Sequence, residues 1–239
     1  MAPPAVSATP EPEGPPTLPT SLPQPESGPP PSPDPPPSPG VPPRPASADR
    51  KAALRRHFRQ RRRQAVIAAP DALTAAAISV VPTLTAPPLR LGLYWPIGHE
   101  PDLRPLAERL PFPWRDHLAL PAIRGDQLLY LPWQPGDPLA PDAVGIPAPT
   151  TGLPLRPAQL GLLLVPALAA DPSGLRLGSG GGWYDRLRSD PLWEAVPALV
   201  VVPAACVAPR LPCDPWDVPF PGRLEESGLQ WSNPSVATS

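Results

Sequence analysis

Apolar residues follow two different spacings from residue 48 onward, and these spacings predict alternating helices and strands. Short apolar runs bounded by turn residues predict strands at 89–95, 117–123, 128–133, 160–168 and 198–206. Apolar residues spaced three to four apart predict four helices. The first begins at Ser47 or Asp49, and the second covers 71–81 and ends at Pro82. The third covers 102–110 with Asp102 as its cap, and the fourth covers 183–196. This alternation predicts an α/β fold with a mostly parallel central sheet flanked by helices.

The segment RLGSGGGWYDR at 176–186 follows the 160–168 strand and holds four glycines in five residues. Glycine is costly to order, so such a loop indicates close approach of a ligand to the backbone or unusual dihedral angles. Open α/β sheets bind ligands beyond the carboxyl ends of their strands, where N–H groups at a helix start attract phosphate. Arg176 and Asp185 flank the loop and suit phosphate oxygens and Mg²⁺. A flexible surface loop is the alternative interpretation.

Two familiar phosphate-binding motifs do not match this loop. A P-loop requires Gly-Lys-Ser/Thr at its end, whereas Gly182 is followed by Trp183. A dinucleotide fingerprint beginning at Gly178 requires glycine at position 183, which is again the tryptophan. The loop is therefore a phosphate-binding loop of another type, or it does not bind phosphate.

Residues 1–47 differ in composition from the rest of the chain. Twenty of the 49 prolines lie in the first 50 residues, in runs such as PPPSPDPPPSPGVPPRP, among almost no aromatic or β-branched residues. Such a segment cannot bury enough apolar surface to offset the entropy lost on ordering. We predict a disordered tail over 1–47, a solvated spacer rather than a ligand for SH3-like partners, then one α/β domain over 48–231 and a flexible C-terminus over 232–239.

Charge and cysteine content exclude several classes of protein. The net charge of −1 argues against attraction of the whole protein to nucleic acid or membranes, and no apolar run reaches the roughly 20 residues that span a bilayer. Cys206 and Cys213 form neither a disulfide framework nor a zinc-binding pattern. We expect a monomer in the reducing cytoplasm that binds small molecules, no membrane and no specific nucleic acid. The arginine cluster RRHFRQRRRQ leaves a nonspecific nucleic-acid patch as an alternative.

The predicted first helix carries the single lysine of the chain. Seven basic and no acidic residues lie between positions 51 and 63, and Lys51 and Arg55 share a face because they are four residues apart. The other 19 basic residues are arginines, so the compact point charge of Lys51 favours a functional contact. A solvated helix charge is the alternative.

Four blocks of sequence point together to one family. They are KAALR from residue 51, YWPIGHEPDLRPL from 94, VPALAADPSGLRLGSGGGWYDRL from 165 and CVAPRLPCDPWDVPF from 206. In this order, over about residues 48–228, they resemble the signatures of the 5-formyltetrahydrofolate cyclo-ligases, also called methenyltetrahydrofolate synthetases. Taken singly, only the glycine block is specific.

The resemblance implies a ligase of folate and one-carbon metabolism that uses ATP and Mg²⁺ to convert 5-formyltetrahydrofolate to 5,10-methenyltetrahydrofolate. It implies Lys51 and Arg176 as catalytic residues and Asp185 and Asp217 as ligands of Mg²⁺. The implied ATP contacts are Lys51, Arg55, Arg176, Leu177, Gly178, Ser179, Gly180, Gly181, Gly182, Trp183 and Tyr184. The implied folate contacts are Trp95, Glu100, Ser179, Gly180, Gly181, Gly182 and Trp183.

Three of these positions keep a structural alternative. Glu100 follows a strand in an apolar turn, where a carboxylate can accept the N–H donors of a pterin, but it is otherwise a surface carboxylate at a helix entry. Trp95 is either a core residue or a wall on which a ring stacks, and both roles are compatible. Asp217 is a metal ligand or a turn carboxylate.

The chain also departs from the family's usual pattern at several positions. The departures are Ser179 for arginine, Trp183 for tyrosine, Ala170 for phenylalanine and Pro221 for a second aspartate. The change at Ser179 removes a cation that Arg186 or Arg210 would have to replace. A catalytically weakened protein that binds folate or nucleotide is therefore the alternative function.

Overall fold

The computed structural model describes residues 46–233, and its largest element is a seven-stranded sheet with the order β11-β10-β9-β6-β1-β2-β3. Neighbours from β10 to β2 are parallel, whereas β11 and β3 pair antiparallel at the edges. The strands are β1 (Arg90–Gly92), β2 (Leu118–Arg124), β3 (Gln127–Trp133), β6 (Leu160–Pro166), β9 (Ala198–Val201), β10 (Gly222–Glu225) and β11 (Gly228–Trp231). The predicted α/β fold with a mostly parallel sheet is confirmed.

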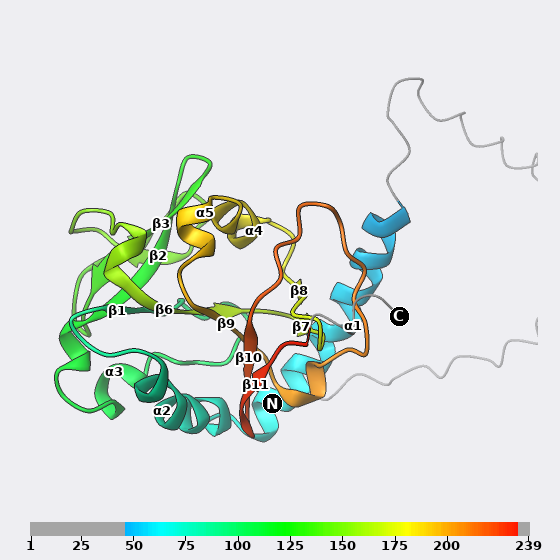
Figure 1. The fold of residues 1–239 in the computed structure, drawn as a ribbon, viewed down its shortest axis with the longest axis horizontal. Coiled ribbons are helices and arrows are strands. Elements are labelled where there is room, and N and C mark those ends of the chain that lie inside the picture. Colours follow the sequence, from blue (N-terminus) through cyan, green and yellow to red (C-terminus); the bar gives the residue numbers. More distant parts are fainter. Residues whose placement is uncertain (1–45, 234–239) are drawn as a thin grey trace, which may run out of the picture. The chain divides into compact units, whose positions relative to one another are not determined.

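Helices cover both faces of the sheet, with α2 and α3 on one face and α4 and α5 on the other (Figure 1). The helices are α1 (Ala46–Ala68), α2 (Ala72–Leu84), α3 (Leu106–Arg109), α4 (Trp183–Arg188) and α5 (Pro191–Glu194). Phe58 of α1 and Leu187 of α4 belong to one core, and Leu73 of α2 belongs to the core on the opposite face. β6 lies between these cores and is buried from Leu160 to Val165, because its apolar side chains point to both sides.

Two short hairpins and three 3₁₀ turns complete the described fold. The hairpins pair β4 (Leu139–Pro141) with β5 (Pro147–Pro149), and β7 (Ala169–Ala170) with β8 (Arg176–Leu177). The 3₁₀ turns are Trp114–Asp116, Pro157–Gln159 and Ala204–Cys206. Neither these elements nor β10 and β11 were expected from the apolar pattern, because each is too short to show a periodicity.

The order of the strands creates a crevice at the centre of the sheet. From β1 the chain moves to β2 on one side, whereas from β6 it moves to β9 and β10 on the other. The direction of winding therefore reverses between β1 and β6, and open α/β sheets bind ligands beyond the carboxyl ends of strands at such a point. The loops that follow β1, β6 and β9 all leave from this edge.

Three predicted helices differ from the observed ones. α2 continues through Pro82 to Leu84, since a proline in the last turn costs one hydrogen bond while the N–H of Thr85 still reaches the carbonyl of Val81 at 3.2 Å. Asp102 does not cap a helix over 102–110: its carboxylate accepts the N–H of Arg104, and only the single turn of α3 follows.

The helix expected over 183–196 is divided into α4 and α5. Asp190 adopts an extended conformation and accepts the N–H of Leu192, and Pro191 begins α5. An N-cap followed by proline starts a new helix, so the earlier one ends at Arg188. Likewise β9 stops at Val201, and Cys206 belongs to a 3₁₀ turn rather than to the strand.

Most of the two predicted flexible ends lies outside residues 46–233. Of the tail predicted over 1–47, Ala46 and Ser47 belong to α1 and the rest lies outside the described residues, as do 234–239 of the expected flexible C-terminus. The single domain over 48–231 stays a prediction. Within residues 46–233 no single helix is long and apolar enough to cross a membrane; the pair formed by α1 and α2, bent by 86°, meets the length and composition test only when taken together.

Candidate active site

The glycine loop leaves β8 at Leu177 and leads directly into α4. Gly180 has φ +119° and Gly182, the N-cap of α4, has φ +66°, conformations that residues with a Cβ rarely adopt. These two residues turn the backbone back over the carboxyl edge of the sheet. Because α4 has only six residues, its dipole is small, and the positive charge near the loop comes from side-chain cations.

Asp171 fixes the base of this loop. It is 1 % exposed, and one of its carboxylate oxygens accepts the N–H and hydroxyl of Ser173 at 3.0 and 2.6 Å and the N–H of Leu175 at 3.1 Å. The other oxygen accepts the N–H of Leu211 at 2.8 Å. A single buried carboxylate therefore joins the β7–β8 turn to the segment that follows β9. Sequence reasoning missed Asp171, although it stands in the quoted glycine block.

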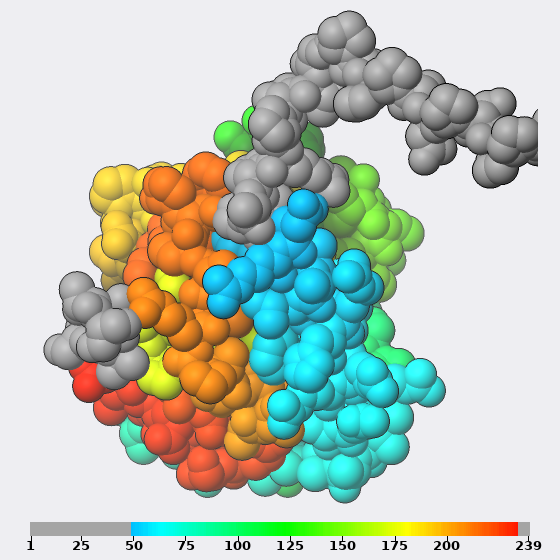
Figure 2. Space-filling model, turned by 90° about the vertical axis from the view of Figure 1, so that its right-hand side faces the viewer, coloured from blue at the N-terminus to red at the C-terminus, as the bar shows by residue number. Residues whose placement is uncertain are grey.

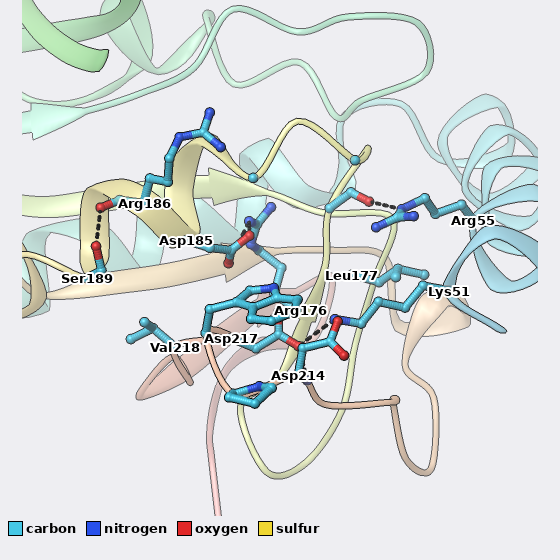
Figure 3. Close-up of a pocket in the computed structure, with 15 residues that line it drawn as sticks. Lys51, Arg55, Arg176, Leu177, Asp185, Arg186, Ser189, Asp214, Asp217 and Val218 are labelled. Carbon is cyan, nitrogen blue, oxygen red and sulfur yellow. Dashed lines mark hydrogen bonds and ion pairs between the residues drawn. The ribbon is translucent and has the colours of Figure 1, made fainter. Parts of the chain in front are cut away.

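A polar cavity of about 500 Å³ lies between α1, the glycine loop and the segment after β9 (Figure 3). Its lining is Lys51, Arg55, Arg176, Leu177, Gly178, Gly180, Gly182, Asp185, Arg186, Ser189, Asp214, Pro215, Trp216, Asp217 and Val218. Lys51 and Arg55 enter from α1 on one side, and Asp185 and Arg186 from α4 on the other. The surface view shows α1, in blue, beside the orange segment that carries Asp214 (Figure 2).

Lys51 lies between two carboxylates of this cavity. Its Nζ is 2.7 Å from an oxygen of Asp214 and 2.6 Å from one of Asp217, and the N–H of Asp214 donates to the same oxygen of Asp217 at 2.7 Å. Burial opposes the charge of Lys51, but the hydrogen bonds to Asp214 and Asp217 outweigh it and raise the pKa of the ammonium. The ammonium is therefore charged at neutral pH.

Two arginines of α1 hold the glycine loop against the helix. Nε of Arg55 donates to the carbonyl of Gly178 at 3.1 Å, and Nη2 of Arg59 reaches the carbonyl of Ser179 at 3.5 Å. The structure thus brings the predicted pair Lys51 and Arg55 to the loop, more than a hundred residues away in sequence. Arg59 of α1 therefore supplies a cation next to Ser179, the residue that replaces the arginine of the family pattern.

Arg176 and Asp185 form the inner wall of the polar cavity. Nη2 of Arg176 is 3.2 Å from both carboxylate oxygens of Asp185, and its guanidinium lies 5.4 Å from the ring of Tyr184 and 5.8 Å from that of Phe220. The Arg176 side chain is 6 % exposed, so these contacts hold it in one orientation. Burial raises the pKa of Tyr184 to about 12, and its hydroxyl therefore stays neutral.

Four basic and three acidic side chains of the described residues face the polar cavity. The basic ones are Lys51, Arg55, Arg176 and Arg186, and the acidic ones are Asp185, Asp214 and Asp217. Arg186, one of the two expected substitutes for the lost cation at Ser179, lies 4.4 Å over the ring of Trp183. The excess of cations and the loop N–H groups suit a polyanion such as a triphosphate.

A smaller, mainly apolar cavity of about 120 Å³ lies on the other side of the glycine loop. Its lining is Tyr94, Trp95, Ile97, Glu100, Pro121, Ile123, Leu128, Asp142, Ile146, Pro166, Arg176, Gly178, Ser179, Gly181, Gly182, Trp183 and Tyr184. Trp95 is held by the guanidinium of Arg104, 4.5 Å from its ring. Aromatic walls with one buried carboxylate suit a flat heterocycle that carries N–H donors.

Glu100 is the buried carboxylate of this apolar cavity. It is 7 % exposed; one oxygen accepts the N–H of Ile97 at 3.1 Å and the other lies 3.3 Å from Nη1 of Arg62. Burial raises the pKa of Glu100, and the charge of Arg62 partly offsets that rise.

The two cavities share three residues of the loop region, Arg176, Gly178 and Gly182. Of the residues expected around ATP, those that line the apolar cavity instead are Ser179, Gly181, Trp183 and Tyr184. Gly180, expected to face both ligands, lines only the polar cavity among the two. The loop therefore presents alternate residues to its two sides, which a linear motif does not reveal.

The expected Mg²⁺ ligands Asp185 and Asp217 both line the polar cavity, together with Asp214. Within residues 46–233, no group of three His, Cys, Asp or Glu side chains is arranged to hold a metal ion by itself. Carboxylate oxygens suit Mg²⁺, which usually takes one or two carboxylates and completes its shell with phosphate oxygens and water. The residues thus fit a metal that arrives with a phosphate ligand rather than a resident ion.

Sequence reasoning named neither Asp214 as a residue of the polar cavity nor Arg62 as the partner of Glu100. Asp214 has a recognisable signal, since it lies three residues before Asp217 in the same proline-rich turn. Arg62 has none, because it is one of seven basic residues in a short helical stretch and only the fold shows which of them is buried.

The fold and these cavities define an open α/β protein with a cation-lined cavity and a mainly apolar cavity on opposite sides of one glycine loop. A sequence profile of the 5-formyltetrahydrofolate cyclo-ligase family matches residues 47–221. The chain belongs to this family.

Relatives and solved structures agree with this assignment. The chain is 30 % identical over 164 residues to the 5-formyltetrahydrofolate cyclo-ligase of Escherichia coli K12, covering 62 % of this chain and 86 % of that protein. It is 33 % identical over 132 residues to the Mycolicibacterium smegmatis protein of the same name, covering 44 % and 64 %. The 5,10-methenyltetrahydrofolate synthetase structure from Aquifex aeolicus superposes with a TM-score of 0.57 at 28 % identity, covering 76 % of this chain and 92 % of that one.

Proposed function

We propose that this protein catalyses the ATP-dependent cyclisation of 5-formyltetrahydrofolate to 5,10-methenyltetrahydrofolate, with release of ADP and phosphate. Membership of the cyclo-ligase family supports this proposal. The observation that carries it is the pair of cavities that meet at the glycine loop, one lined by cations and the other by aromatic rings with a buried carboxylate. Such a pair suits a reaction between a triphosphate and a heterocycle.

The chemistry requires both substrates at one place. The formyl oxygen of an amide is a poor leaving group, so ring closure first requires its activation. Transfer of the γ-phosphoryl group of ATP to that oxygen breaks the bond to ADP and leaves the formyl group, still bound to N5, as an O-phosphorylated iminium. N10 then attacks the formyl carbon, N10 loses its proton, and the oxygen departs with the phosphate. Positioning and charge neutralisation account for most of the acceleration of such a transfer.

The residues of the polar cavity have the properties needed to bind and orient ATP. Lys51 and Arg55 come from α1 and Arg176 from the opposite wall, so cations reach the phosphates from two sides. Gly178, Gly180 and Gly182 of the glycine loop line the same cavity. Arg176 also lines the apolar cavity, which supports a role for this cation in neutralising charge where the phosphoryl group would meet the formyl oxygen.

Mg²⁺ would be held by Asp185 and Asp217, with Asp214 beside them, and would neutralise phosphate charge when bound. In the apolar cavity, Trp95 and Trp183 would enclose the pterin ring and Glu100 would accept hydrogen bonds from its N–H groups.

We further propose that the enzyme acts on these small molecules as a monomer in the cytoplasm. Two thiols support a reducing compartment: Cys206 is buried, Cys213 is exposed, and both are free.

A spectroscopic assay tests the proposed reaction. Purified protein is mixed with 5-formyltetrahydrofolate, Mg²⁺ and ATP, and the near-ultraviolet absorbance of the methenyl product is followed. We expect a rise that depends on ATP and vanishes when ATP is omitted. Folded protein that binds 5-formyltetrahydrofolate but forms no product would instead identify the weakened binding protein considered as the alternative.

A further inference from the structure

Arg62 is a buried arginine of α1 with no role in the proposed reaction described above. It is 6 % exposed, whereas its neighbours Arg61 and Arg63 on the same helix are exposed. Its Nη1 donates to the carbonyl of Ala167 at 3.0 Å and to an oxygen of Glu100 at 3.3 Å. One guanidinium nitrogen thus ties α1 to the residue after β6 and to the loop after β1.

The carboxylate of Glu100 is fixed from two directions. The N–H of Ile97 holds one oxygen and Arg62 holds the other, and the two side chains of the ion pair are 7 % and 5 % exposed. A buried carboxylate that loses its cation is strongly disfavoured and takes up a proton instead. A protonated Glu100 is a poorer acceptor, because one of its oxygens then carries a hydrogen.

The other charged and titratable groups around Glu100 do not replace Arg62. Arg176 of β8 acts on Glu100 through its charge but is hydrogen-bonded to Asp185. Tyr94, after β1, and Tyr184 of α4 interact with Glu100 only as buried hydroxyls whose own pKa values are raised by burial. Within the described residues, Arg62 is the cation that hydrogen-bonds to Glu100.

We propose that Arg62 is a positioning residue for folate recognition, which holds the Glu100 carboxylate ionised and in a single orientation at the apolar cavity. Arg62 does not line that cavity, so it acts through Glu100 rather than by touching the ligand. This inference rests on the proposed function for the identity of the ligand.

The test measures the affinity for 5-formyltetrahydrofolate by tryptophan fluorescence, without ATP, between about pH 5 and 9. Glu100 must be ionised to bind, so affinity falls on the acidic side of its pKa. Arg62→Gln raises that pKa further. The acidic limb, the pH range in which affinity falls as Glu100 takes up a proton, is therefore expected to move to higher pH by about one unit or more. At a given pH on this limb the affinity is about tenfold lower than that of the wild type, and it recovers at alkaline pH. Arg62→Lys retains the charge and is expected to lie between Arg62→Gln and the wild type.

A double-mutant cycle separates positioning from a merely structural role. Glu100→Gln abolishes the acidic limb, and in that background Arg62→Gln is expected to change affinity by less than about twofold. Arg56→Gln is the matched control, because it removes the same charge from an exposed position of the same helix. The KM for ATP is expected to stay within about twofold of the wild type in Arg62→Gln, since Arg62 does not line the polar cavity.

The proposal is overturned if folded Arg62→Gln shows the same acidic limb as the wild type. It is also overturned if Arg62→Gln lowers the affinity for 5-formyltetrahydrofolate equally in the wild-type and Glu100→Gln backgrounds. If Arg62→Gln does not fold, Arg62→Lys is measured in its place. Its acidic limb must lie at higher pH than that of the wild type, and a limb at the same pH overturns the inference. The outcome is independent of turnover. If the wild type forms product but the acidic limb of Arg62→Gln is not shifted, this inference alone is wrong. If Arg62→Gln shifts the limb but the wild type forms no product, the proposed function alone is wrong. If the wild type does not bind 5-formyltetrahydrofolate, both are wrong.

Discussion

Replacement of Lys51 by methionine tests whether the polar cavity binds ATP. The substitution keeps an unbranched chain of similar length on α1 but removes the charge beside Asp214 and Asp217. A hydrogen bond to a charged group contributes about 1.5–3 kcal/mol, so loss of one such contact to a phosphate lowers kcat/KM for ATP about 10- to 150-fold. The affinity for 5-formyltetrahydrofolate is expected to stay unchanged, because Lys51 does not line the apolar cavity.

The same substitution has a separate effect on stability. The substitution removes two ion pairs whose side chains are only 11–14 % exposed. Their burial is intermediate between that of a surface ion pair and that of a fully buried one. We therefore expect a loss of about 1–3 kcal/mol and a fall in Tm of about 3–10 °C. Because the pKa of Lys51 is raised in the folded protein, this stabilisation is complete below the unfolded pKa and disappears only as the pH rises through the folded value. The Tm difference is thus constant from neutral to about pH 9.

Steady-state kinetics with ATP as the varied substrate, together with calorimetric melting, measure both effects. Arg56→Gln serves again as control, since this exposed residue lies on the same helix. If Lys51→Met retained kcat/KM for ATP within about twofold, the phosphates would not lie beside Lys51 and the assignment of the polar cavity would be wrong.

Three further substitutions or measurements check the loop, the sheet and the thiols. Gly182→Ala places a Cβ at φ +66°, which costs about 1–2 kcal/mol and is expected to lower Tm by several degrees and raise KM for both substrates; an unchanged Tm contradicts the left-handed turn. Gly92→Ala puts a Cβ 2.5 Å from a buried leucine methyl group in the sheet core, and an expected loss of about 1–3 kcal/mol in urea unfolding tests that packing. A thiol reagent is expected to modify Cys213 in the native protein, and Cys206, whose pKa burial raises to about 11, only after unfolding; two rapidly reacting thiols in the native state would refute this.

Most of the parallel sheet was predictable from sequence, because long apolar runs such as the one at 160–168 have one stable place in an α/β protein. The strands at 117–123 and 128–133 were also predictable, because Gly125 and Asp126 between them are typical turn residues. The structure pairs them as an antiparallel hairpin, with Gly125 at φ +62° in the turn. The division of the last predicted helix was not predictable, although Asp190 and Pro191 gave the local signal for a new helix start. The apolar spacing continues across that break, and periodicity alone therefore joins the two helices.

The composition of the site was only partly predictable. The glycine loop and the lysine of α1 stand out in sequence because both are unusual, one in glycine density and the other as the single lysine among arginines. The pairing of Lys51 with Asp214 joins positions 163 residues apart. The sequence places Asp214 in the same turn as Asp217 but does not show that either carboxylate meets Lys51. Likewise, only the three-dimensional structure shows that Arg62 is buried while Arg61 and Arg63 are exposed.

The charge arrangement of the polar cavity bears directly on how ATP would bind. Lys51 is paired with Asp214 and Asp217, and Arg176 with Asp185, so the cations that face the cavity are partly neutralised by the protein itself. A triphosphate alone would have to separate these pairs and leave carboxylates facing its own negative charge. With Mg²⁺ on the triphosphate, Lys51 and Arg176 would instead pair with phosphate oxygens, and Asp185 and Asp217 would hold the metal. Under the proposed function, ATP affinity therefore depends steeply on Mg²⁺, and equal affinity for free and Mg²⁺-bound ATP would refute this exchange.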